Sequence, residues 1–590
     1  MPDSRIETSS FDNRQRFYGR SLLLISFFVT GCRSEQETSA PAMKETTLSA
    51  EKDSGTERVF DFEDCTPKSG VSFVYKNGEE SGHFAILESL GGGVGILDFD
   101  LDHNDDLFFP GGGKFDERPY PIGVSAGLFR NLGDMRFSDA SLNSSLRESS
   151  KYSHGASVAD CDNDGFPDIL VTGFGGLQLW KNLGDGTFTE AAISAGLCDS
   201  LWSSSAAWGD LNRDGALDLY IAHYANWSFE NHPVCQGPQP GLREICPPRQ
   251  YDGLRDSLYI SNGDGTFRDG STEWGLAEGG KGLGVIMADL DLDGDLDIYV
   301  TNDTVENFLY ENQGDHLDDV SLISGSSVSE QGVAEGSMGV GVFDYNLDGS
   351  PDVWVVNYEN ESASLYENIG KLSFRHVSDR AGVTGAGLFV GWGTCCFDID
   401  LNGFDDIFVS NGHVIRYPIN APVEQLPILL ENLSGVRFRN VATAAGSYMT
   451  EVHKGRGAAI SDLDNDGAVD LIVSNNNQPV RLLRNRTKRK GRWLEIELSG
   501  TTSSRDAVGA IVTLVSGHVR QVKQVVGGGS YASTNSRRIF FGIPADTALE
   551  SVEVRWPSGN VQFIERPEVD QILRLIEVPS NHTRIGSKVE

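Results

Sequence analysis

The chain has little positive charge, and this shortage argues against a large class of functions. Its 590 residues include 48 Lys and Arg against 85 Asp and Glu, so its formal net charge is −37 at pH 7. A surface that binds nucleic acid needs clustered lysine and arginine to neutralise phosphates. We therefore expect no nucleic-acid partner. So many carboxylates in one chain repel each other unless cations or solvent compensate for them.

Long apolar runs are also missing from the sequence. The one candidate, residues 22–29, is too short to cross a bilayer as a stable helix. It follows Arg14, Arg16 and Arg20, and small residues separate it from Cys32. A basic start, a short apolar segment and small residues before a cleavage point are typical of a secretory signal.

The end of this segment, Val-Thr-Gly-Cys at residues 29–32, resembles a bacterial lipoprotein box. The resemblance implies that residues 1–32 form a lipoprotein signal peptide and that Cys32 is lipid-modified. Arg33 is not the aspartate that marks inner-membrane retention, which implies secretion across the inner membrane to an outer-membrane or cell-surface position. An ordinary signal peptide cleaved nearby is the alternative. Residues 33–57, rich in Ser, Glu and Thr, are expected to form a flexible tether.

Signatures of catalysis are absent from the sequence as well. There is no HExxH helix or P-loop, and the GxSxG string at residues 123–127 leads into the apolar strand that ends at Asn131 rather than into the helix of a nucleophile elbow. His154, His223, His413 and His453 could line a ligand site on a face of the fold, or they could be ordinary loop residues. We assign no catalytic residue and leave enzymatic activity as an open alternative.

One acidic loop pattern dominates the sequence. It reads Asp-x-Asp/Asn-x-Asp/Asn-Gly-x-x-Asp with strand-like apolar residues on both sides, and it occurs seven times. Its copies, here called loops 1 to 7, start at Asp98, Asp160, Asp210, Asp289, Asp344, Asp398 and Asp462. Six copies have Gly at the sixth position, whereas loop 1 has His103 there.

This spacing predicts calcium coordination, with up to seven ions. Oxygen ligands at alternating positions of a tight loop converge on one hard cation, glycine permits the turn, and the seventh residue can offer its backbone carbonyl. Asp/Gly turns without metal are the alternative for any single copy. The candidate ligands are Asp98, Asp100, Asp102, Asn104 and Asp106; Asp160, Asp162, Asp164, Phe166 and Asp168; Asp210, Asn212, Asp214, Ala216 and Asp218; Asp289, Asp291, Asp293, Asp295 and Asp297; Asp344, Asn346, Asp348, Ser350 and Asp352; Asp398, Asp400, Asn402, Phe404 and Asp406; and Asp462, Asp464, Asp466, Ala468 and Asp470.

The loops are not expected to bind metal equally. Loops 2, 4 and 7 keep Asp at positions 1, 3, 5 and 9 together with Gly at position 6, so we expect them to bind most tightly. Loop 1 should bind more weakly because His103 replaces the glycine.

A second half-repeat follows each acidic loop. An apolar strand that usually ends in Asn leads to a Phe strand, and in several repeats a Gly lies eight residues beyond that Phe. About four strands per repeat indicate an all-β fold, a seven-bladed β-propeller. The seventh repeat lacks its Phe strand after Asn485, whereas Phe62 and Gly70 show the same spacing at the other end of the chain. We therefore expect residues 59–66 to supply the outer strand of the seventh blade.

The repeats resemble the FG-GAP/VCBS calcium-loop repeats of integrin α-subunit propellers. Residues 506–510 (DAVGA), 527–531 (GGGSY) and 554–559 (VRWPSG) resemble the ASPIC/UnbV domain, which follows such propellers in bacterial proteins and in cartilage acidic protein. The resemblance implies a propeller over residues 58–488, a small C-terminal β domain over residues 489–578 and a disordered tail over residues 579–590. Without a strand-to-helix context, the glycines at 527–529 are interpreted as a turn, and Trp493 and Trp556 as core residues of the β domain.

The cysteines fit an oxidising compartment. Cys235 and Cys246 lie in a Pro-rich insertion, residues 224–256, and we expect them to form a disulfide. Spacing alone leaves the pairing of the other cysteines open, and they do not form a zinc pattern. These are Cys65, Cys161, Cys198, Cys395 and Cys396.

Together these features predict a calcium-binding, lipid-anchored surface protein that binds an extracellular or envelope protein or polysaccharide through its propeller loops. Two alternatives belong to other classes. One is an extracytoplasmic enzyme with its site at the propeller channel, and the other is a structural envelope protein. The sequence names neither the ligand nor the oligomeric state.

Overall fold

The computed structural model describes residues 60–116, 120–146, 151–384, 389–579 and 583–585. The chain divides into two units, Met1–Thr56 and Glu57–Glu590, and all the described residues belong to the second. The predicted signal peptide, the lipidation site Cys32 and the tether therefore lie outside the described residues. No helix in the described part of the chain is long and apolar enough to cross a membrane.

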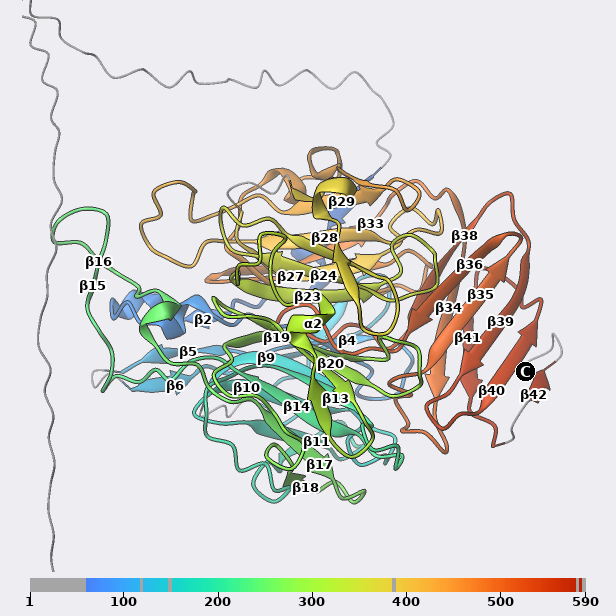
Figure 1. Cartoon of the computed structure of the whole chain (residues 1–590), viewed down its shortest axis with the longest axis horizontal. Coiled ribbons are helices and arrows are strands. Elements are labelled where there is room, and N and C mark those ends of the chain that lie inside the picture. Colours follow the sequence, from blue (N-terminus) through green and yellow to red (C-terminus); the bar gives the residue numbers. More distant parts are fainter. Residues whose placement is uncertain (1–59, 117–119, 147–150, 385–388, 580–582, 586–590) are drawn as a thin grey trace, which may run out of the picture. The chain divides into compact units, whose positions relative to one another are not determined.

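The repeats fold into seven antiparallel sheets with four repeat strands each, here called blades 1 to 7, and the sheet of blade 4 has a fifth strand, β37 (Gly527–Gly528). Figure 1 labels many of these strands. The prediction of an all-β fold is confirmed. From the innermost to the outermost strand, the blades are β3 (Gly95–Leu97), β4 (Asp106–Phe109), β7 (Gly127–Asn131), β8 (Phe137–Asp139); β9 (Tyr152–Ala159), β10 (Asp168–Phe174), β11 (Gln178–Asn182), β12 (Phe188–Glu190); β13 (Ser203–Gly209), β14 (Asp218–His223), β17 (Ser257–Ser261), β18 (Phe267–Asp269); β19 (Gly282–Ala288), β20 (Asp297–Asn302), β21 (Phe308–Asn312), β22 (Leu317–Asp319); β23 (Ser337–Phe343), β24 (Asp352–Asn357), β25 (Ser364–Asn368), β26 (Phe374–His376); β27 (Gly391–Phe397), β28 (Asp406–Asn411), β29 (Ile428–Asn432), β30 (Phe438–Asn440); and β31 (Gly455–Ser461), β32 (Asp470–Asn475), β33 (Gln478–Asn485), β1 (Phe62–Asp64).

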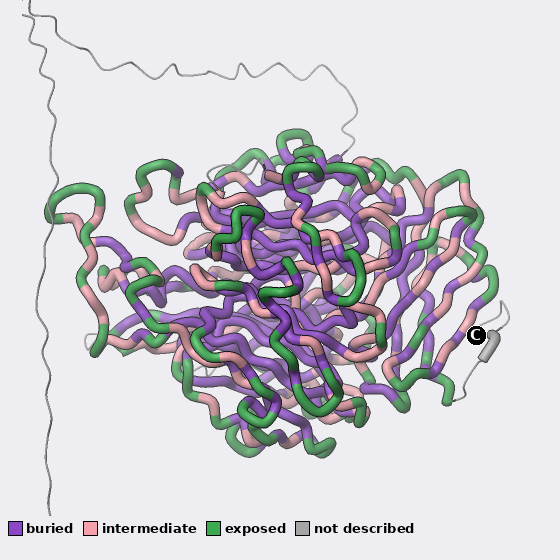
Figure 2. The backbone as a smooth tube through the Cα atoms, in the orientation of Figure 1, coloured by how far each residue is buried: buried purple, intermediate pink, exposed green. Residues whose placement is uncertain are grey.

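The innermost strands form a closed ring. Each contacts the innermost strand of the next blade, in the order β3, β9, β13, β19, β23, β27 and β31, and β31 contacts β3. Most of these strands are buried along their whole length, and in Figure 2 buried residues follow the strands while exposed residues mark the loop tips. A closed ring of blades leaves only short, protected sheet edges.

The seventh blade is completed by the N-terminal end of the described chain, as the sequence predicts. Strand β1 pairs antiparallel with β33, and Phe62 lies opposite Asn485. The backbone N–H of Phe62 also donates to the carbonyl of Ala445 in the connection that leaves blade 6, at 3.1 Å. Phe62 is 1% exposed. Residues that are 423 positions apart thus form one sheet edge.

The Phe/Gly spacing reflects contact between neighbouring blades. A Cβ on Gly446 would lie 2.3 Å from the carbonyl oxygen of Phe62, and one on Gly70 would lie 2.5 Å from that of Phe137. Both glycines also have positive φ angles, 109° and 87°. Only glycine combines that backbone with so close an approach. Gly70 follows the short helix α1 (Thr66–Ser69), which links blade 7 to blade 1.

The C-terminal strands form two further sheets. One has the order β38 (Ile539–Pro544), β34 (Gly491–Ser499), β41 (Ile572–Ile576), and the other β36 (Val519–Gln524), β35 (Ile511–Ser516), β39 (Leu549–Arg555), β40 (Val561–Glu565), β42 (Thr583–Ile585). Trp556 is buried in their core, as expected, in a cluster that also holds Val285 and Met287 of blade 4. Trp493 is only partly buried, so the core prediction for it is wrong.

Smaller elements gather at the blade ends opposite the acidic loops. Strands β2 (Lys76–Asn77), β5 (Gly112–Phe115) and β6 (Pro121–Gly123) form one sheet, and β15 (Cys235–Gln236) pairs with β16 (Arg243–Glu244) in the insertion. The predicted disulfide between Cys235 and Cys246 is confirmed, with the Cα atoms 5.3 Å apart. The remaining helical segments are α2 (Ser321–Ser324), α3 (Ser378–Ala381), η1 (Glu79–Ser81), η2 (Ile86–Ser89), η3 (Pro248–Gln250), η5 (Ala442–Ala444) and η6 (Tyr448–Thr450).

Removing the closing strand should destabilise the protein, whereas removing the tether should not. We expect a chain that starts at residue 67 to lose at least about 3 kcal/mol of unfolding free energy, since truncation of one buried Phe alone costs that much. A chain that starts at residue 58 should melt like the full mature chain. Scanning calorimetry with light scattering checks both, and equal melting temperatures for the two truncations would contradict the role of β1.

Candidate metal centres and the centre of the ring

The seven acidic loops share one hydrogen-bonding scheme at their first aspartate. In every loop the N–H of the sixth residue donates to this carboxylate, as Gly165 does to Asp160 at 2.8 Å. Glycine at position 6 has a positive φ angle, 99° in Gly165 and in Gly294, and His103 adopts 68° in loop 1. Loop 1 therefore keeps the turn, although a non-glycine residue must adopt a left-handed backbone there.

The aspartate at the ninth position of each loop is buried and accepts two backbone hydrogen bonds. One carboxylate oxygen accepts the N–H of the second loop residue, and the other accepts the N–H of the residue that ends the third strand of the blade. Asp168 does so with Cys161 at 3.3 Å and Asn182 at 2.8 Å. The same pair of bonds recurs at Asp106, Asp218, Asp297, Asp352, Asp406 and Asp470.

Burial makes the charged form of these carboxylates costly. Desolvation raises the pKa of Asp106 to about 9 and that of Asp352 to about 8, against the opposing hydrogen bonds from backbone N–H groups. At the first position, desolvation raises the pKa of Asp98 to about 6 and that of Asp344 to about 7. A nearby cation would favour the ionised form of each.

Carboxylate oxygens from three aspartates converge in five of the loops. The oxygen atoms lie within 4.8 Å of one another in the sets Asp98, Asp100, Asp106; Asp160, Asp162, Asp164; Asp289, Asp291, Asp297; Asp398, Asp400, Asp406; and Asp462, Asp464, Asp470. Loops 3 and 5 have Asn212 and Asn346 at the third position instead.

Several of these oxygens are buried without a hydrogen bond. The Oδ1 atoms of Asp100, Asp289, Asp400 and Asp464 accept none from the described residues. A buried acceptor without a partner costs free energy, and a cation would satisfy it. A tight loop with oxygen donors only fits a hard divalent cation such as calcium.

Basic or acidic side chains from the third strand reach these loops, a feature that the sequence reasoning missed. The residue before the strand-ending Asn is basic in blades 1, 2 and 7. Arg130 Nε lies 2.5 Å from Asp100, Lys181 Nζ lies 2.7 Å from Asp162, and Arg484 pairs with Asp464. The corresponding residues of blades 4, 5 and 6 are Glu311, Glu367 and Glu431, and that of blade 3 is Ile260. The sequence does carry this signal: the third strand ends in Arg-Asn or Lys-Asn in blades 1, 2 and 7 and in Glu-Asn in blades 4, 5 and 6.

The strand-ending asparagines link consecutive blades. The Asn182 side chain donates to the carbonyl of Phe99 in loop 1 at 2.9 Å, and Asn432 donates to Tyr345 in loop 5 at 2.9 Å. Asn131 donates to Leu463 in loop 7 at 2.8 Å, which extends the pattern across the junction of blades 1 and 7. Ser261, at this place in blade 3, has no amide to donate. The sequence marks these asparagines as strand ends but does not reveal the partner.

The C-terminal sheets lie against the acidic loops. Arg538 donates to the carbonyl of His103 at 2.6 Å, Arg505 N–H donates to Asn163 at 2.9 Å, and Gln524 donates to the carbonyl of Asp289 at 2.8 Å. The ring of Trp493 packs so closely on loop 7 that a Cβ on Gly467 would lie 2.1 Å from it. Trp493 is therefore a loop contact rather than a core residue.

Residues 525–538, here called the axial segment, join β36 to β38 and run through the ring of innermost strands. The sequence predicted that the glycines at 527–529 form a turn. This prediction is wrong, because β37 (Gly527–Gly528) pairs with β19. Further along, Ser530 bonds Val340, Thr394 and Ala458, Ala532 bonds Ser205 and Ala156, and Thr534 bonds Val94 and Ile96. Together with the pairing of β37 and β19, these contacts reach all seven innermost strands. Val94 itself lies just before β3, and Ile96 lies within it. The axial segment therefore fills the centre of the ring.

Close approach explains why glycine is needed in this segment. A Cβ on Gly527 would lie 1.9 Å from the carbonyl oxygen of Trp208, and one on Gly528 would lie 2.4 Å from that of Val285. From the other side, a Cβ on Gly93 would lie 1.9 Å from the carbonyl oxygen of Ala532. A run of glycines can mark a turn or a close passage of two backbones, and the sequence alone does not distinguish them.

The candidate histidines do not form one site. His154 and His223 lie inside β9 and β14 rather than in loops, and both are buried. Burial lowers the pKa of His154 to about 3, and its Nε2 accepts a hydrogen bond from Trp202 at 2.8 Å. His223 is held by Asp199 at 2.7 Å. His413 alone among the four borders a cavity that is also lined by Glu79, Arg416 and Lys454.

Two family models match this chain. The FG-GAP-like repeat matches residues 160–221, 251–300 and 289–355, which lie within blades 2 to 5. The ASPIC and UnbV model matches residues 500–582, which include the axial segment. The chain carries FG-GAP-like repeats and an ASPIC and UnbV domain.

Curated relatives are similar over most of the chain. Cartilage acidic protein 1 of Xenopus tropicalis is 24% identical over 463 residues, which is 72% of this chain and 65% of that protein. The human protein of the same name is 24% identical over 73% of this chain and 64% of its own length. The chain is homologous to cartilage acidic protein 1. It spans less than two thirds of the length of these relatives.

Solved structures match this chain at low sequence identity and with low TM-scores. A lectin from Agrocybe aegerita that recognises non-reducing terminal N-acetylglucosamine is 16% identical, with a TM-score of 0.36, and the match covers 68% of this chain and 92% of that one. BBS1N, solved in complex with ARL6DN, is 9% identical, with a TM-score of 0.34, and the match covers 72% of this chain and 98% of that one.

Substitution of Gly527 tests the axial segment. We expect Gly527→Ala to lower the unfolding free energy by about 1–3 kcal/mol, because its methyl group would overlap the Trp208 carbonyl. Gly237→Ala is the matched control, since its Cβ would meet its nearest neighbour, the Leu242 side chain, at 3.2 Å. Urea unfolding followed by tryptophan fluorescence measures both, and equal effects of the two variants would contradict the proposed close contact.

Proposed function

We propose that the protein is a calcium-binding, lipid-anchored extracytoplasmic protein that binds a protein or polysaccharide through its propeller loops. The observation that supports calcium most directly is the buried, unbonded carboxylate oxygen at the third position of loops 1, 6 and 7 and at the first position of loop 4. When bound, calcium would supply positive charge where desolvated carboxylates face one another. The side chains at positions 1, 3, 5 and 9 and the backbone carbonyl at position 7 would hold it.

The loops are proposed to differ in affinity because their third strands differ in charge. In blades 1, 2 and 7, Arg130, Lys181 and Arg484 already neutralise the aspartates and would compete with a metal ion. Loop 4 has four candidate aspartates at positions 1, 3, 5 and 9, and Glu311 adds negative charge near Asp291 and Asp293. Loop 6 is intermediate, because Lys490 lies 2.5 Å from Asp400 and 3.4 Å from Glu431. Of the three loops that the sequence ranks highest, we therefore propose loop 4 as the tightest.

Exchanging these charges should redistribute calcium affinity. Lys181→Glu removes the competing cation from loop 2 and should tighten that loop, whereas Glu311→Lys should weaken loop 4. We expect changes of about tenfold, or about 1.4 kcal/mol per site. Calorimetric titration of the metal-free protein with calcium measures the affinities and stoichiometry. Melting curves with and without chelator measure the linked stability.

A matched control separates local from overall charge. Lys114→Glu makes the same charge change in β5, on an exposed side chain away from the acidic loops. It should leave the calcium titration within about twofold of wild type. If chelator does not shift the melting curve of the wild-type protein, the calcium proposal is wrong. If Lys181→Glu behaves like Lys114→Glu, the proposed ranking is wrong.

The lipid anchor is proposed from the lipoprotein box and has its own test. Cys32→Ser should release the protein from the membrane fraction into the soluble extract while its melting temperature stays that of the wild-type ectodomain. The comparison is fractionation after a high-salt wash, which removes proteins held by charge alone. A variant that stays with the membrane after this wash would show that Cys32 is not the anchor.

Ligand binding is proposed for the blade ends opposite the acidic loops, because the C-terminal sheets pack on the loop side. The enzyme alternative finds little support, since the axial segment fills the centre of the ring where its site was expected. The structural alternative predicts no soluble ligand. A protein and glycan array probed with the full calcium-loaded chain, with and without chelator, distinguishes a ligand-binding protein from a purely structural one.

A further inference from the structure

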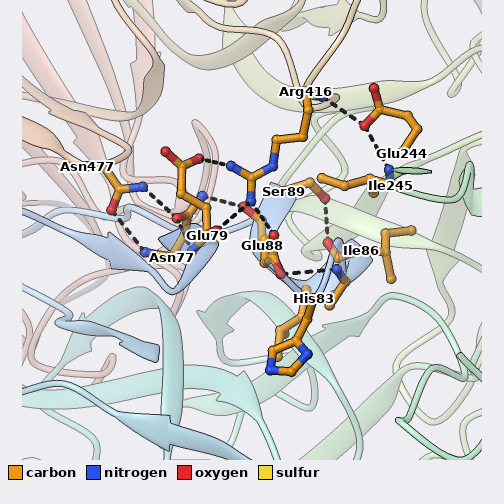
Figure 3. A network of polar contacts seen from close by, with 12 residues as sticks. Asn77, Glu79, His83, Ile86, Glu88, Ser89, Glu244, Ile245, Arg416 and Asn477 are labelled. Carbon is orange, nitrogen blue, oxygen red and sulfur yellow. Dashed lines mark hydrogen bonds and ion pairs between the residues drawn. The ribbon is translucent and has the colours of Figure 1, made fainter. Parts of the chain in front are cut away.

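Three segments from distant parts of the chain meet at the blade ends opposite the acidic loops. They are residues 77–90, which precede blade 1, the insertion at 224–256 in blade 3, and residues 412–427, which join β28 to β29 in blade 6. Figure 3 shows their contact, with Arg416 reaching between the acidic side chains of the first segment. Their convergence walls off a space that no single repeat could form.

A polar network fixes these segments to one another. Arg416 Nη1 lies 2.6 Å from Glu79 and its Nη2 contacts Glu88. Glu244 of the insertion accepts the backbone N–H of Arg416 at 2.9 Å (Figure 3). It also accepts the backbone N–H of Tyr417 at 2.8 Å. Burial would raise the pKa of Glu79, but Arg416 and Lys454 outweigh burial and hold it below its ordinary value. The walls are therefore held by ionised, hydrogen-bonded groups.

These segments and the start of blade 7 line a cavity of about 650 Å³ that is open to solvent on one side. This volume lies within the range of about 300–1,000 Å³ that is usual for small-molecule sites. Part of its lining is apolar, from Phe84, Ile245 and Val423 among others, and part is polar. The polar part includes Asn77, Glu79, Glu88, Arg416, Lys454, Arg456 and Asn476.

The amide of Asn476 is the feature that points to a ligand. Asn476 lies between β32 and β33, borders the cavity and is 2% exposed. Neither its Oδ1 nor its Nδ2 has a hydrogen-bond partner within the described part of the chain. A buried amide left unbonded on both atoms is destabilising and uncommon. A molecule in the cavity that both donates and accepts hydrogen bonds would satisfy it.

The charges of the lining restrict the class of that molecule. Three carboxylates, Glu79, Glu88 and Glu424, face three cations, Arg416, Lys454 and Arg456, so their formal charges cancel. Arg416 and Lys454 already pair with Glu79. A strongly anionic or cationic ligand would have to displace a partner from this network. The lining thus favours a neutral ligand with hydrogen-bonding groups on one side and an apolar face on the other.

We propose that this cavity binds a neutral saccharide unit, which rests on and narrows the ligand-binding function proposed above. A sugar ring carries hydroxyl groups that both donate and accept, and its C–H face suits the wall of Phe84, Ile245 and Val423. A flat protein surface does not fill a recessed cavity, and a peptide offers one N–H for each carbonyl rather than several hydroxyl groups on one ring. Asn476 is the residue that contacts the hydroxyl groups.

The axial segment also supports the floor of this cavity. Tyr531 accepts the N–H of Gly91 at 3.0 Å, and its ring lies 4.7 Å from that of Trp392. The Arg456 guanidinium lies 4.3 Å over the same Trp392 ring. Arg456 borders the cavity and packs on Trp392, which in turn contacts Tyr531. The axial segment of the C-terminal domain therefore supports a polar part of the cavity lining.

Replacing Asn476 separates binding from folding. The probes are arrays of neutral oligosaccharides of glucose, galactose, mannose and N-acetylglucosamine, with uronic-acid oligosaccharides and peptides alongside, and the full calcium-loaded chain is the analyte. We expect a neutral glycan to bind and Asn476→Ala to weaken that binding at least tenfold. Its melting temperature should equal or exceed that of wild type, because the amide forms no hydrogen bond within the described protein.

Ser410→Ala is the matched control. Ser410 lies in β28, is fully buried, and its hydroxyl likewise has no hydrogen-bond partner in the described chain, but it does not border the cavity. It should keep both melting temperature and glycan binding. Absence of any bound neutral glycan, or equal binding by Asn476→Ala, would overturn the saccharide site. A peptide that binds and is lost in Asn476→Ala would overturn the saccharide class while leaving the broader proposal of ligand binding intact.

Discussion

The propeller depends on one interaction repeated seven times, the buried carboxylate at the ninth position of each acidic loop. Both of its oxygens accept backbone N–H groups, one from the start of the loop and one from the end of the third strand, as Asp168 does with Cys161 and Asn182. The asparagine fixed in this way then donates to the loop of the preceding blade in six of the seven blades. Blade geometry and blade packing thus follow from the same side chains.

This arrangement concentrates negative charge where solvent cannot screen it, and the protein has two ways to compensate. Arginine or lysine from the third strand neutralises loops 1, 2 and 7 internally. Loops 4, 5 and 6 place a glutamate at that position instead, and in loop 6 Lys490 pairs with Asp400. For loops 4 and 5 the proposed compensation is a bound cation. The same acidic motif therefore serves a structural role in every blade, whatever its metal affinity.

Much of the fold was predictable because its repeated motifs occur at regular intervals in the sequence. The acidic loops, the strand-ending asparagines and the pairing of Phe62 with blade 7 all follow from regular intervals in one repeat. The Cys235–Cys246 disulfide follows from two cysteines close together in one insertion. Predictions failed where one residue type has two physical uses. The glycines at 527–529 pass close to other backbones rather than turning, and Trp493 packs on a loop. The cavity could not be predicted, because its walls come from three irregular insertions that meet only in the folded ring.

Both ends of the described chain are needed to complete the ring. Strand β1 completes the last blade, and the axial segment, from the final hundred residues, fills the centre. A chain synthesised from its N-terminus must therefore keep its first strand unpaired until β33 has been made. It must also hold an unfilled ring until residues beyond 525 arrive. The ring is consequently completed only when nearly the whole chain is available, and until then the partly assembled blades carry unpaired edges that are open to premature association and proteolysis.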